Sequence, residues 1–358
     1  MKDVPIPPSA PHLPDAYRLS EARGEHVQAQ PRCVFIEVTN RCNLACAACV
    51  RSVRWPEPPR DLTLDEFDAL IEQFPALERA VLHGIGEPLL NRQLPEMIRR
   101  LKKRGVTVLF NSNGTLLTPD RQEALALSGL DEYRLSLDSA DPRLYESLRG
   151  RPLFDRVVRN VREFVATQKR LGVKGPKLSL WCIGMKENIE QLPELVRLAG
   201  EIGIAEVYVQ RLVYLLDPRQ RRGLAGPEQT LFGRLAARER EIVAECARLG
   251  KALGIAFRAS GATDPDESLS AARKGEERPW RACLRPWTTA YITAQGNALP
   301  CCIAPFAATH YDELVLGNIW EKSFVEIWND APYRRWRGRL LGDSPPEACS
   351  GCGVCWSL

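Results

Sequence analysis

The feature that most constrains this fold is a repeated alternation of short apolar runs and amphipathic segments between residues 33 and 258. Apolar runs separated by helical patterns are typical of parallel strands that are joined by helices. We predict six strand–helix repeats, with strands over residues 33–38, 79–83, 106–111, 133–138, 177–183 and 205–211. Eight repeats would close a full barrel. Six repeats therefore predict an α/β fold with a partial (β/α)6 TIM-like barrel.

Local signals place helices between these strands. Thr63-Leu64-Asp65-Glu66 is a capping box, which begins a helix. Pro119 follows Thr118 and suits the first position of another helix. A long charged helix is predicted over residues 227–253, followed by a short strand over residues 255–258.

The composition changes along the chain and divides it into four parts. We expect an N-terminal extension over residues 1–32, which are rich in proline, and the partial barrel over residues 33–260. Residues 261–281 are charged and lack periodicity, so we expect a linker there. A small cysteine-rich α+β domain is predicted over residues 282–358. A domain of that size usually needs a crosslink or a bound metal to be stable, and metal bound by its cysteines would supply that stability.

The charge balance and the absence of export signals narrow the function classes. The 49 basic and 45 acidic side chains leave a net charge of +4, which excludes a polyanion binder driven by bulk charge. No nucleic-acid partner is therefore expected. The sequence has no run of about 18 apolar residues, so we expect no transmembrane helix and no membrane partner. The N-terminus lacks an apolar signal region, which predicts a cytoplasmic protein.

Twelve cysteines are many for a cytoplasmic chain, where disulfides are rare, so metal binding or catalysis is the better interpretation. Three of them, Cys33, Cys182 and Cys246, stand alone in apolar or helical stretches and are expected in the core. The other nine form two sets. The first is Cys42, Cys46 and Cys49, and the second is Cys283, Cys301, Cys302, Cys349, Cys352 and Cys355.

The first set follows the first predicted strand, at the end of the barrel where catalysis takes place in such folds. Its C-x3-C-x2-C spacing lets three thiolates surround one metal centre. Structural zinc usually takes four ligands, and a [4Fe–4S] cluster normally takes four cysteines. Three ligands would leave one iron open to a ligand or substrate. A structural zinc site is the alternative.

The residues around this set resemble the radical S-adenosylmethionine (SAM) superfamily over residues 33 to about 211. Glu37-Val38-Thr39-Asn40-Arg41-Cys42-Asn43-Leu44-Ala45-Cys46-Ala47-Ala48-Cys49 resembles its cluster loop, and His83-Gly84-Ile85-Gly86-Glu87-Pro88 its Gly-Gly-Glu-Pro segment. Asn111-Ser112-Asn113-Gly114-Thr115 resembles its Asn-Gly-Thr turn. Ser136-Leu137-Asp138-Ser139 and Arg149-Gly150 resemble its later segments.

This resemblance implies that SAM binds the open iron and is cleaved reductively to a 5′-deoxyadenosyl radical, which abstracts a substrate hydrogen. It also implies the residues that contact SAM, although it identifies no catalytic base: Gly84, Gly86, Glu87, Pro88, Asn113, Ser136, Asp138 and Arg149. Glycine at 84 and 86 would let the backbone approach a ligand closely. Two positions depart from the family pattern. Ile85 replaces one glycine, and Ala48 replaces an aromatic residue near the adenine, so adenine packing must come from elsewhere.

The second set begins with a predicted β-hairpin. Its first strand covers residues 291–293, its turn lies at residues 295–297, and its second strand leads back to Cys301. A hairpin of this kind brings Cys283 and Cys301 to one end. The segment resembles the SPASM/Twitch extension of radical SAM enzymes, which carries auxiliary Fe–S clusters. Six cysteines favour one auxiliary [4Fe–4S] cluster, for which we expect the ligands Cys283, Cys301, Cys349 and Cys352.

Several alternatives remain open in this second set. Cys355 could replace one ligand, or it could join Cys302 and an outside ligand in a second cluster. Cys302 could equally be a packed bystander. Four of these thiolates would also make a structural zinc site.

The chemistry depends on how the auxiliary cluster is held. A cluster held fully by protein suits electron transfer and so a two-electron oxidation (dehydrogenation). A cluster with an open position suits peptide modification such as crosslinking. The substrate is then a small molecule or a peptide, and the family implies a low-potential donor such as flavodoxin or ferredoxin. Residues at the sixth strand and the basic loop after it could recognise the substrate: Gln210, Arg211, Tyr214, Arg219, Arg221 and Arg222.

The alternative function is an Fe–S scaffold or electron-transfer protein that has lost SAM cleavage, which Ala48 favours. No leader-binding winged-helix domain is expected ahead of the first strand, because only the short extension precedes it.

Overall fold

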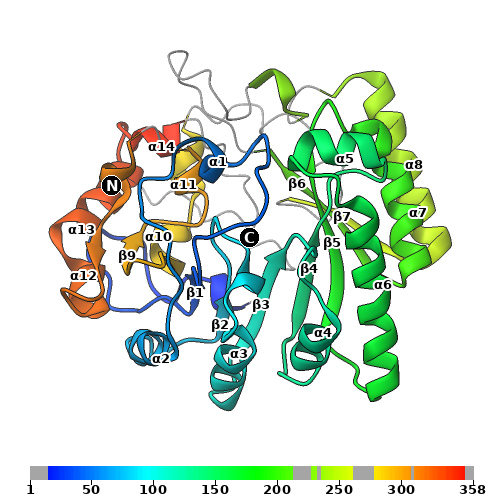
Figure 1. The fold of residues 1–358 in the computed structure, drawn as a ribbon. Coiled ribbons are helices and arrows are strands. Elements are labelled where there is room, and N and C mark those ends of the chain that lie inside the picture. Colours follow the sequence, from blue (N-terminus) through cyan, green and yellow to red (C-terminus); the bar gives the residue numbers. More distant parts are fainter. Residues whose placement is uncertain (1–14, 213–226, 232–234, 261–277, 308–309, 351–358) are drawn as a thin grey trace.

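The computed structural model describes residues 15–212, 227–231, 235–260, 278–307 and 310–350, and a single sheet organises them (Figure 1). The order of its ten strands is β10-β9-β8-β1-β2-β3-β4-β5-β6-β7. The strands are β1 (Cys33–Ile36), β2 (Arg79–Val81), β3 (Thr107–Ser112), β4 (Glu132–Ser136), β5 (Lys177–Gly184), β6 (Glu206–Arg211), β7 (Ala256–Ala259), β8 (Thr289–Ile292), β9 (Asn297–Leu299) and β10 (Gly317–Asn318).

Strands β1 to β7 all pair in parallel, and helices connect them along the outside of the sheet (Figure 1). The helices of this part are α1 (Val50–Arg54), α2 (Leu64–Glu72), α3 (Leu94–Lys103), α4 (Pro119–Ala126), α5 (Pro142–Arg149), α6 (Phe154–Leu171), α7 (Leu192–Ile202) and α8 (Ala237–Leu253). The fold class is therefore confirmed. All six predicted strands are present, and β7 adds a seventh parallel strand where the short strand was predicted.

The helix starts that were predicted from local sequence signals are confirmed in part. Thr63 and Glu66 form the predicted capping box at the start of α2. The helix predicted over residues 227–253 is wrong in its first part, because a 3-10 turn covers Pro227–Gln229 and α8 begins only at Ala237. Glu239 explains that start, since its carboxylate accepts a hydrogen bond from the Ala236 backbone N–H and so caps the helix there.

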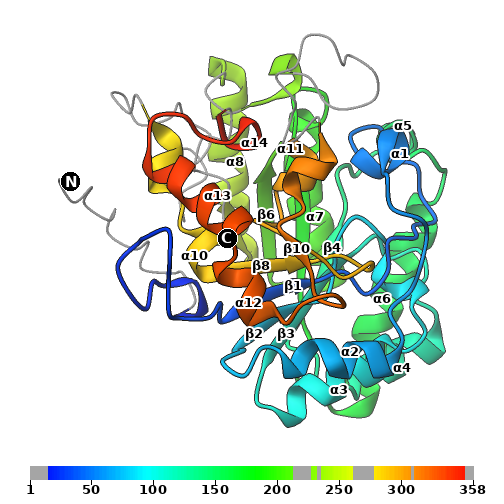
Figure 2. The ribbon, with the colours of Figure 1, turned by 90° about the vertical axis from the view of Figure 1, so that its left-hand side faces the viewer.

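The C-terminal segment extends the barrel sheet. Strand β8 pairs in parallel with β1, with Cys33 opposite Thr289, and β9 and β10 continue the sheet in antiparallel fashion (Figure 2). The predicted hairpin is formed by β8 and β9. Gly296 lies in its turn with a φ of 84°, a left-handed conformation that glycine adopts readily. The remaining helices are α10 (Arg285–Thr288), α11 (Ala304–Ala307), α12 (Phe324–Asn329), α13 (Ala331–Leu341) and α14 (Glu347–Ser350).

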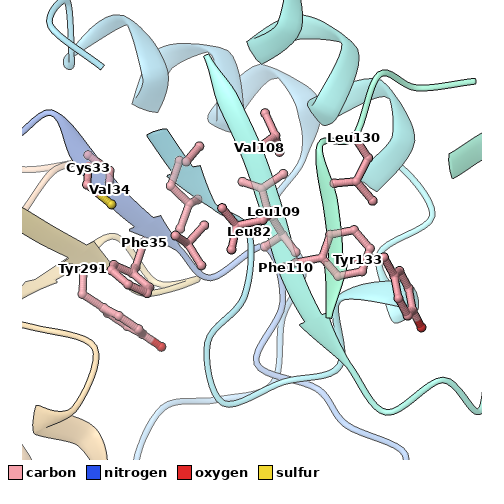
Figure 3. Close-up of a cluster of buried hydrophobic side chains, with 14 of the residues drawn as sticks. Cys33, Val34, Phe35, Leu82, Val108, Leu109, Phe110, Leu130, Tyr133 and Tyr291 are labelled. Atoms are coloured by element: carbon pink, nitrogen blue, oxygen red, sulfur yellow. The ribbon is translucent and has the colours of Figure 1, made fainter. Parts of the chain in front are cut away.

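The core lies between the sheet and its outer helices (Figure 3). Parallel strands buried on both faces require near-continuous apolar runs. Strand β1 meets this condition, because Cys33, Val34, Phe35 and Ile36 are all buried. The other two solitary cysteines, Cys182 and Cys246, are also buried, as expected. No helix among the described residues is long and apolar enough to cross a membrane.

Candidate active site

One cavity lies at the carboxyl ends of the parallel strands and is lined by the three thiols of the first set, Cys42, Cys46 and Cys49. Residues after β2, β3, β4, β5 and β6 form its walls, because the ends of parallel strands meet at one edge of a sheet. Seven of the eight residues predicted to contact SAM also line it: Gly84, Gly86, Glu87, Asn113, Ser136, Asp138 and Arg149. Pro88 lies outside the lining and begins the 3-10 turn Pro88–Leu90.

The three thiols are held by the backbone of the loop after β1. The Cys49 N–H donates to the Cys46 carbonyl at 3.2 Å, and the Ala47 N–H donates to the Leu148 carbonyl at 3.0 Å. Burial raises the pKa of Cys42 to about 11 and also raises the pKa of Cys49. Iron must therefore displace their protons when it binds.

The three thiols are a donor set that fits a [4Fe–4S] cluster. They line one cavity, and in such a cluster each cysteine thiolate binds a different iron. Three thiolates would hold three irons and leave the fourth open to another ligand.

Glu87 organises the turn after β3. Its carboxylate accepts hydrogen bonds from the Ser112 hydroxyl at 2.7 Å, the Asn113 N–H at 2.8 Å and the Leu89 N–H at 3.2 Å. The side chain is 2% exposed, and burial raises its pKa. Glu87 thus holds the β2 and β3 turns together at the cavity wall.

Asn43 connects the cysteine loop to the same turn and was not among the predicted site residues. Its side-chain N–H donates to the Thr115 hydroxyl at 2.7 Å, and its oxygen accepts from the Asn113 side chain at 3.0 Å. Its place next to Cys42 inside the family-like loop was the signal that could have identified it. The contacts set the position of the cysteine loop over the strand ends.

Asp138 and Arg149 form a buried ion pair, with 2.6 Å between Oδ2 and Nη2 and side chains only 7% and 10% exposed. The other carboxylate oxygen of Asp138 accepts the Ile183 N–H at 2.8 Å. Nη1 of Arg149 lies 4.0 Å from the Cys46 sulfur. A cation is therefore held beside a thiol that would carry negative charge as a cluster ligand.

The two glycines of the β2 turn are required by the protein itself. A Cβ on Gly84 would collide with the Glu37 carboxylate and the Tyr291 hydroxyl, and a Cβ on Gly86 would collide with the Thr39 and Arg41 carbonyls. The reason for glycine is thus the close packing of this turn on the loop after β1. Ile85, which replaces one glycine of the family pattern, still holds the turn in place through its backbone, because its N–H donates to the Glu37 carboxylate at 3.0 Å.

Ala48 belongs to a small apolar group beside the thiols. Met185 and Leu212 are buried there, and Ala48, Leu148 and Ile183 pack against them. All five residues line the cavity. This group provides an apolar wall of the kind that a flat base would need, which the alanine at position 48 alone does not provide.

The barrel interior supplies polar residues that the sequence reasoning missed. The Arg134 guanidinium stacks on Trp181, 4.0 Å from the ring centroid, and pairs with Glu132 at 2.9 Å. His83 accepts the Asn111 N–H on Nδ1 at 3.1 Å, and burial lowers its pKa to about 3, so the ring is neutral. His83, Arg134 and Trp181 all line the cavity. The alternation of inward-facing positions along β4 and β5 was the available signal.

Of the residues proposed for substrate recognition, Gln210 and Arg211 line the cavity. The remaining four lie outside the described residues: Tyr214, Arg219, Arg221 and Arg222. Tyr17 also lines the cavity, although it belongs to the predicted N-terminal extension.

The second cysteine set lies beside the sheet extension. Cys283, Cys301 and Cys349 are all partly exposed, while Cys352 and Cys355 lie outside the described residues. Cys283 and Cys301 are close enough for the charge of Cys301 to raise the pKa of Cys283, although burial is the larger cause. The expectation that the hairpin brings them together agrees with this proximity.

Cys302 differs from its neighbour. Its sulfur accepts a hydrogen bond from Nη1 of Arg285 at 2.6 Å, and its side chain lines the same cavity as the three thiols of the first set. Cys302 also packs against the hydrophobic core. The two interpretations given for it, a cluster ligand and a packed bystander, therefore both stay predictions.

Comparisons with known proteins agree with this geometry. The sequence model of the radical SAM superfamily matches residues 36–199, and that of an iron–sulfur cluster-binding domain, SPASM, matches residues 283–353. A tungsten-containing aldehyde ferredoxin oxidoreductase cofactor-modifying protein of Pyrococcus furiosus is 31% identical over 185 residues. That match covers 51% of this chain and 52% of the relative, so it spans about half of each protein.

Two further relatives match over most of their length. The PqqA peptide cyclase of Xanthomonas campestris pv. campestris is 27% identical over 331 residues, which cover 90% of this chain and 79% of the cyclase. The AdoMet-dependent heme synthase of Methanosarcina barkeri is 27% identical over 335 residues, which cover 91% of this chain and 88% of the synthase.

The same fold occurs in the crystal structure of Streptococcus suis SuiB bound to its precursor peptide SuiA. The TM-score is 0.66 at 20% identity, over 92% of this chain and 71% of SuiB. The two sequence models, the parallel sheet and the thiol-lined cavity lead to one conclusion. This chain is a member of the radical SAM superfamily with a C-terminal SPASM-type iron–sulfur domain.

Proposed function

We propose that this enzyme cleaves SAM in the cavity at the strand ends and oxidises a peptide by two electrons overall. The observation that carries the proposal is that the three thiols and seven family-like polar or glycine positions line the same cavity. When bound, the [4Fe–4S] cluster and SAM supply the 5′-deoxyadenosyl radical that removes a substrate hydrogen.

The residues of the chain have distinct roles in this proposal. The thiolates of Cys42, Cys46 and Cys49 hold the cluster and leave one iron open. Arg149, which Asp138 keeps in position, offsets the negative charge beside Cys46. Glu87 and Asn113 shape the turns that face SAM, through the hydrogen bond that the Asn113 N–H donates to the Glu87 carboxylate. The remaining predicted contacts are Gly84, Gly86, Pro88, Ser136 and Asp138.

The auxiliary cluster would take the electron that the substrate radical loses. Its proposed ligands are Cys283, Cys301, Cys349 and Cys352, with Cys355 as the replacement for one of them. We further propose the domain limits 33–260 for the barrel and 282–358 for the auxiliary domain, with an extension over 1–32 and a linker over 261–281. Because the protein carries many thiols, a reducing compartment such as the cytoplasm suits it.

Two relatives support a peptide as the substrate. PqqA peptide cyclase is named for a peptide, and SuiB is the protein described with a bound precursor peptide. The polar and aromatic interior around Arg134, Trp181 and His83 would contact such a substrate. A second candidate is a step of heme synthesis, because a heme synthase matches this chain at the same identity and over 88% of its own length.

The first experiment tests SAM cleavage. Anaerobically reconstituted protein with dithionite and SAM should form 5′-deoxyadenosine, and the triple variant C42A/C46A/C49A should form none. That variant should also lose about four irons per chain while it keeps about four at the auxiliary site. Cys246→Ala, at a buried cysteine away from both sets, is the control. Intact clusters without 5′-deoxyadenosine would contradict the proposal and support the scaffold alternative.

The second experiment tests the substrate class. Short peptides encoded next to the gene should lose two hydrogens when they are incubated with the enzyme, a reductant and SAM, as mass spectrometry would detect. A product from a porphyrin, with no change in any peptide, would favour the second candidate.

A further inference from the structure

Helix α13 carries three exposed arginines on the surface of the auxiliary domain: Arg334, Arg335 and Arg339. They line a shallow groove together with Glu25, Ala331 and Gly338. Arg339 donates to the Ser344 and Pro345 carbonyls at 3.1 and 2.8 Å. Neither Arg334 nor Arg335 forms an ion pair with any residue that the structure describes.

The residues that line the groove decide its charge. Glu25 is its acidic lining residue, beside the three arginines. Asp343 is shared by two guanidinium groups, those of Arg278 at 2.6 Å and Arg281 at 2.7 Å. The groove therefore has a net positive charge.

The opposite face of α13 leads to the thiols of the second set. Tyr333, next to Arg334, is fully buried and donates from its hydroxyl to the Leu299 carbonyl at 3.3 Å, two residues before Cys301. Nε of Arg337 donates to the Pro286 carbonyl at 2.9 Å, three residues after Cys283. Buried side chains of α13 thus contact the backbone within three residues of both cysteines.

We propose that the α13 groove is the docking surface for an acidic one-electron carrier protein that exchanges electrons with the auxiliary cluster. This inference rests on the proposed function, which leaves one electron on that cluster after each substrate oxidation. The oxidised carrier takes the electron, so the cluster returns to its oxidised state and the carrier is reduced by one electron. An exposed basic patch steers an acidic partner and needs only a small interface for such an encounter.

The experiment uses flavodoxin as the carrier. Dithionite-reduced holoenzyme, freed of excess dithionite, is mixed rapidly with oxidised flavodoxin, and the semiquinone is followed by its absorbance. R334E/R335E should lower the second-order rate constant about tenfold or more at low ionic strength, and added salt should reduce the difference. R334K/R335K keeps the charge and should keep the rate.

The matched control is R156E/R159E, which reverses two exposed arginines on α6. It should leave the rate constant unchanged. The same comparison in the C42A/C46A/C49A background isolates the auxiliary cluster. If charge reversal on α13 slows the holoenzyme but not this background, the carrier docks for the other cluster and the inference is overturned.

Failure of the inference can be separated from failure of the proposed function. Dithionite-driven formation of 5′-deoxyadenosine does not need the carrier, so R334E/R335E should match the wild type in that assay. If the wild type forms the product while R334E/R335E and R156E/R159E give equal flavodoxin rates, only the docking surface is wrong. If the wild type forms no product, the proposed function fails first.

Discussion

The Tyr291 hydroxyl donates a 2.8 Å hydrogen bond to Oε2 of Glu37, which joins two residues 254 positions apart in the sequence. Tyr291 lies on β8 of the auxiliary segment, and Glu37 follows β1, five residues before Cys42. The same carboxylate accepts the Ile85 N–H at 3.0 Å and the Ala294 N–H at 3.2 Å. One buried carboxyl group therefore holds the barrel, the β2 turn and the auxiliary segment together beside the cysteine loop.

Tyr291→Phe should lower the free energy of unfolding by about 1.5–3 kcal/mol, because it leaves a buried carboxyl group without one of its donors. Denaturant unfolding under anaerobic conditions measures the loss. Tyr145→Phe is the matched control, since its hydroxyl is buried and has no hydrogen-bond partner among the described residues. Equal losses for the two variants would mean that the Tyr291–Glu37 bond does not contribute to stability.

Stability should fall between about pH 4.5 and pH 7 because of Glu37. Burial raises the pKa of this carboxyl group from an ordinary 4.5 to about 7, so the folded protein keeps a proton that the unfolded chain has lost. The stabilisation is complete below pH 4.5 and is lost as the pH rises through 7. The shift corresponds to about 3 kcal/mol.

Glu37→Gln tests this dependence because glutamine does not titrate. The difference in unfolding free energy between wild type and variant should change by about 3 kcal/mol from pH 4.5 to pH 8. Unfolding curves at several pH values measure it. A difference that stays constant with pH would show that folding does not raise the pKa of Glu37.

Asp138→Asn should weaken SAM binding and cost about 3 kcal/mol or more of stability. The variant leaves the buried Arg149 guanidinium without its anion, and an unpaired buried charge is costly. Denaturant unfolding and equilibrium dialysis with SAM measure the two effects. Glu201→Gln breaks the exposed pair with Arg162, 52% and 64% exposed, and should cost no more than about 1 kcal/mol. A similar small cost for Asp138→Asn would contradict the role given to this pair.

Met185→Ala should raise the dissociation constant of SAM about five- to thirtyfold. It removes one of the two buried side chains of the apolar wall next to Ala48, and such a loss is worth about 1–2 kcal/mol of ligand contact. Equilibrium dialysis on the reconstituted enzyme provides the constant. Met97→Ala, on the buried face of α3, should reduce stability and leave SAM binding unchanged. If both variants bind SAM equally well, the adenine packs elsewhere.

The parts of the fold that local patterns determine were predictable. The apolar runs identified all six strands from β1 to β6, and the Thr63–Glu66 capping box located the start of α2. The cysteine spacing and its place after β1 indicated a metal centre at the strand ends. Each of these signals involves residues that are close in sequence, so no knowledge of the tertiary structure was needed.

The residues that complete the cavity from a distance could not be predicted in the same way. Tyr17, Tyr291 and Cys302 come from the N-terminal segment and the auxiliary segment, and all three line the cavity. Nothing in their local sequence shows which barrel residue they meet. Arg134 and Trp181 were predicted to lie in strands, but only the stagger of β4 against β5 brings the guanidinium onto the ring.

The sequence by itself therefore determined the parallel barrel, the two sets of thiols and the superfamily, because periodicity, caps and motif spacing act over a few residues. Only the tertiary structure decided that β8 pairs with the edge of β1, so that the auxiliary segment extends the barrel sheet and reaches Glu37. The physical reason is that a short apolar strand has the same local pattern whichever edge it joins. Backbone pairing and buried hydrogen bonds between distant residues select the edge.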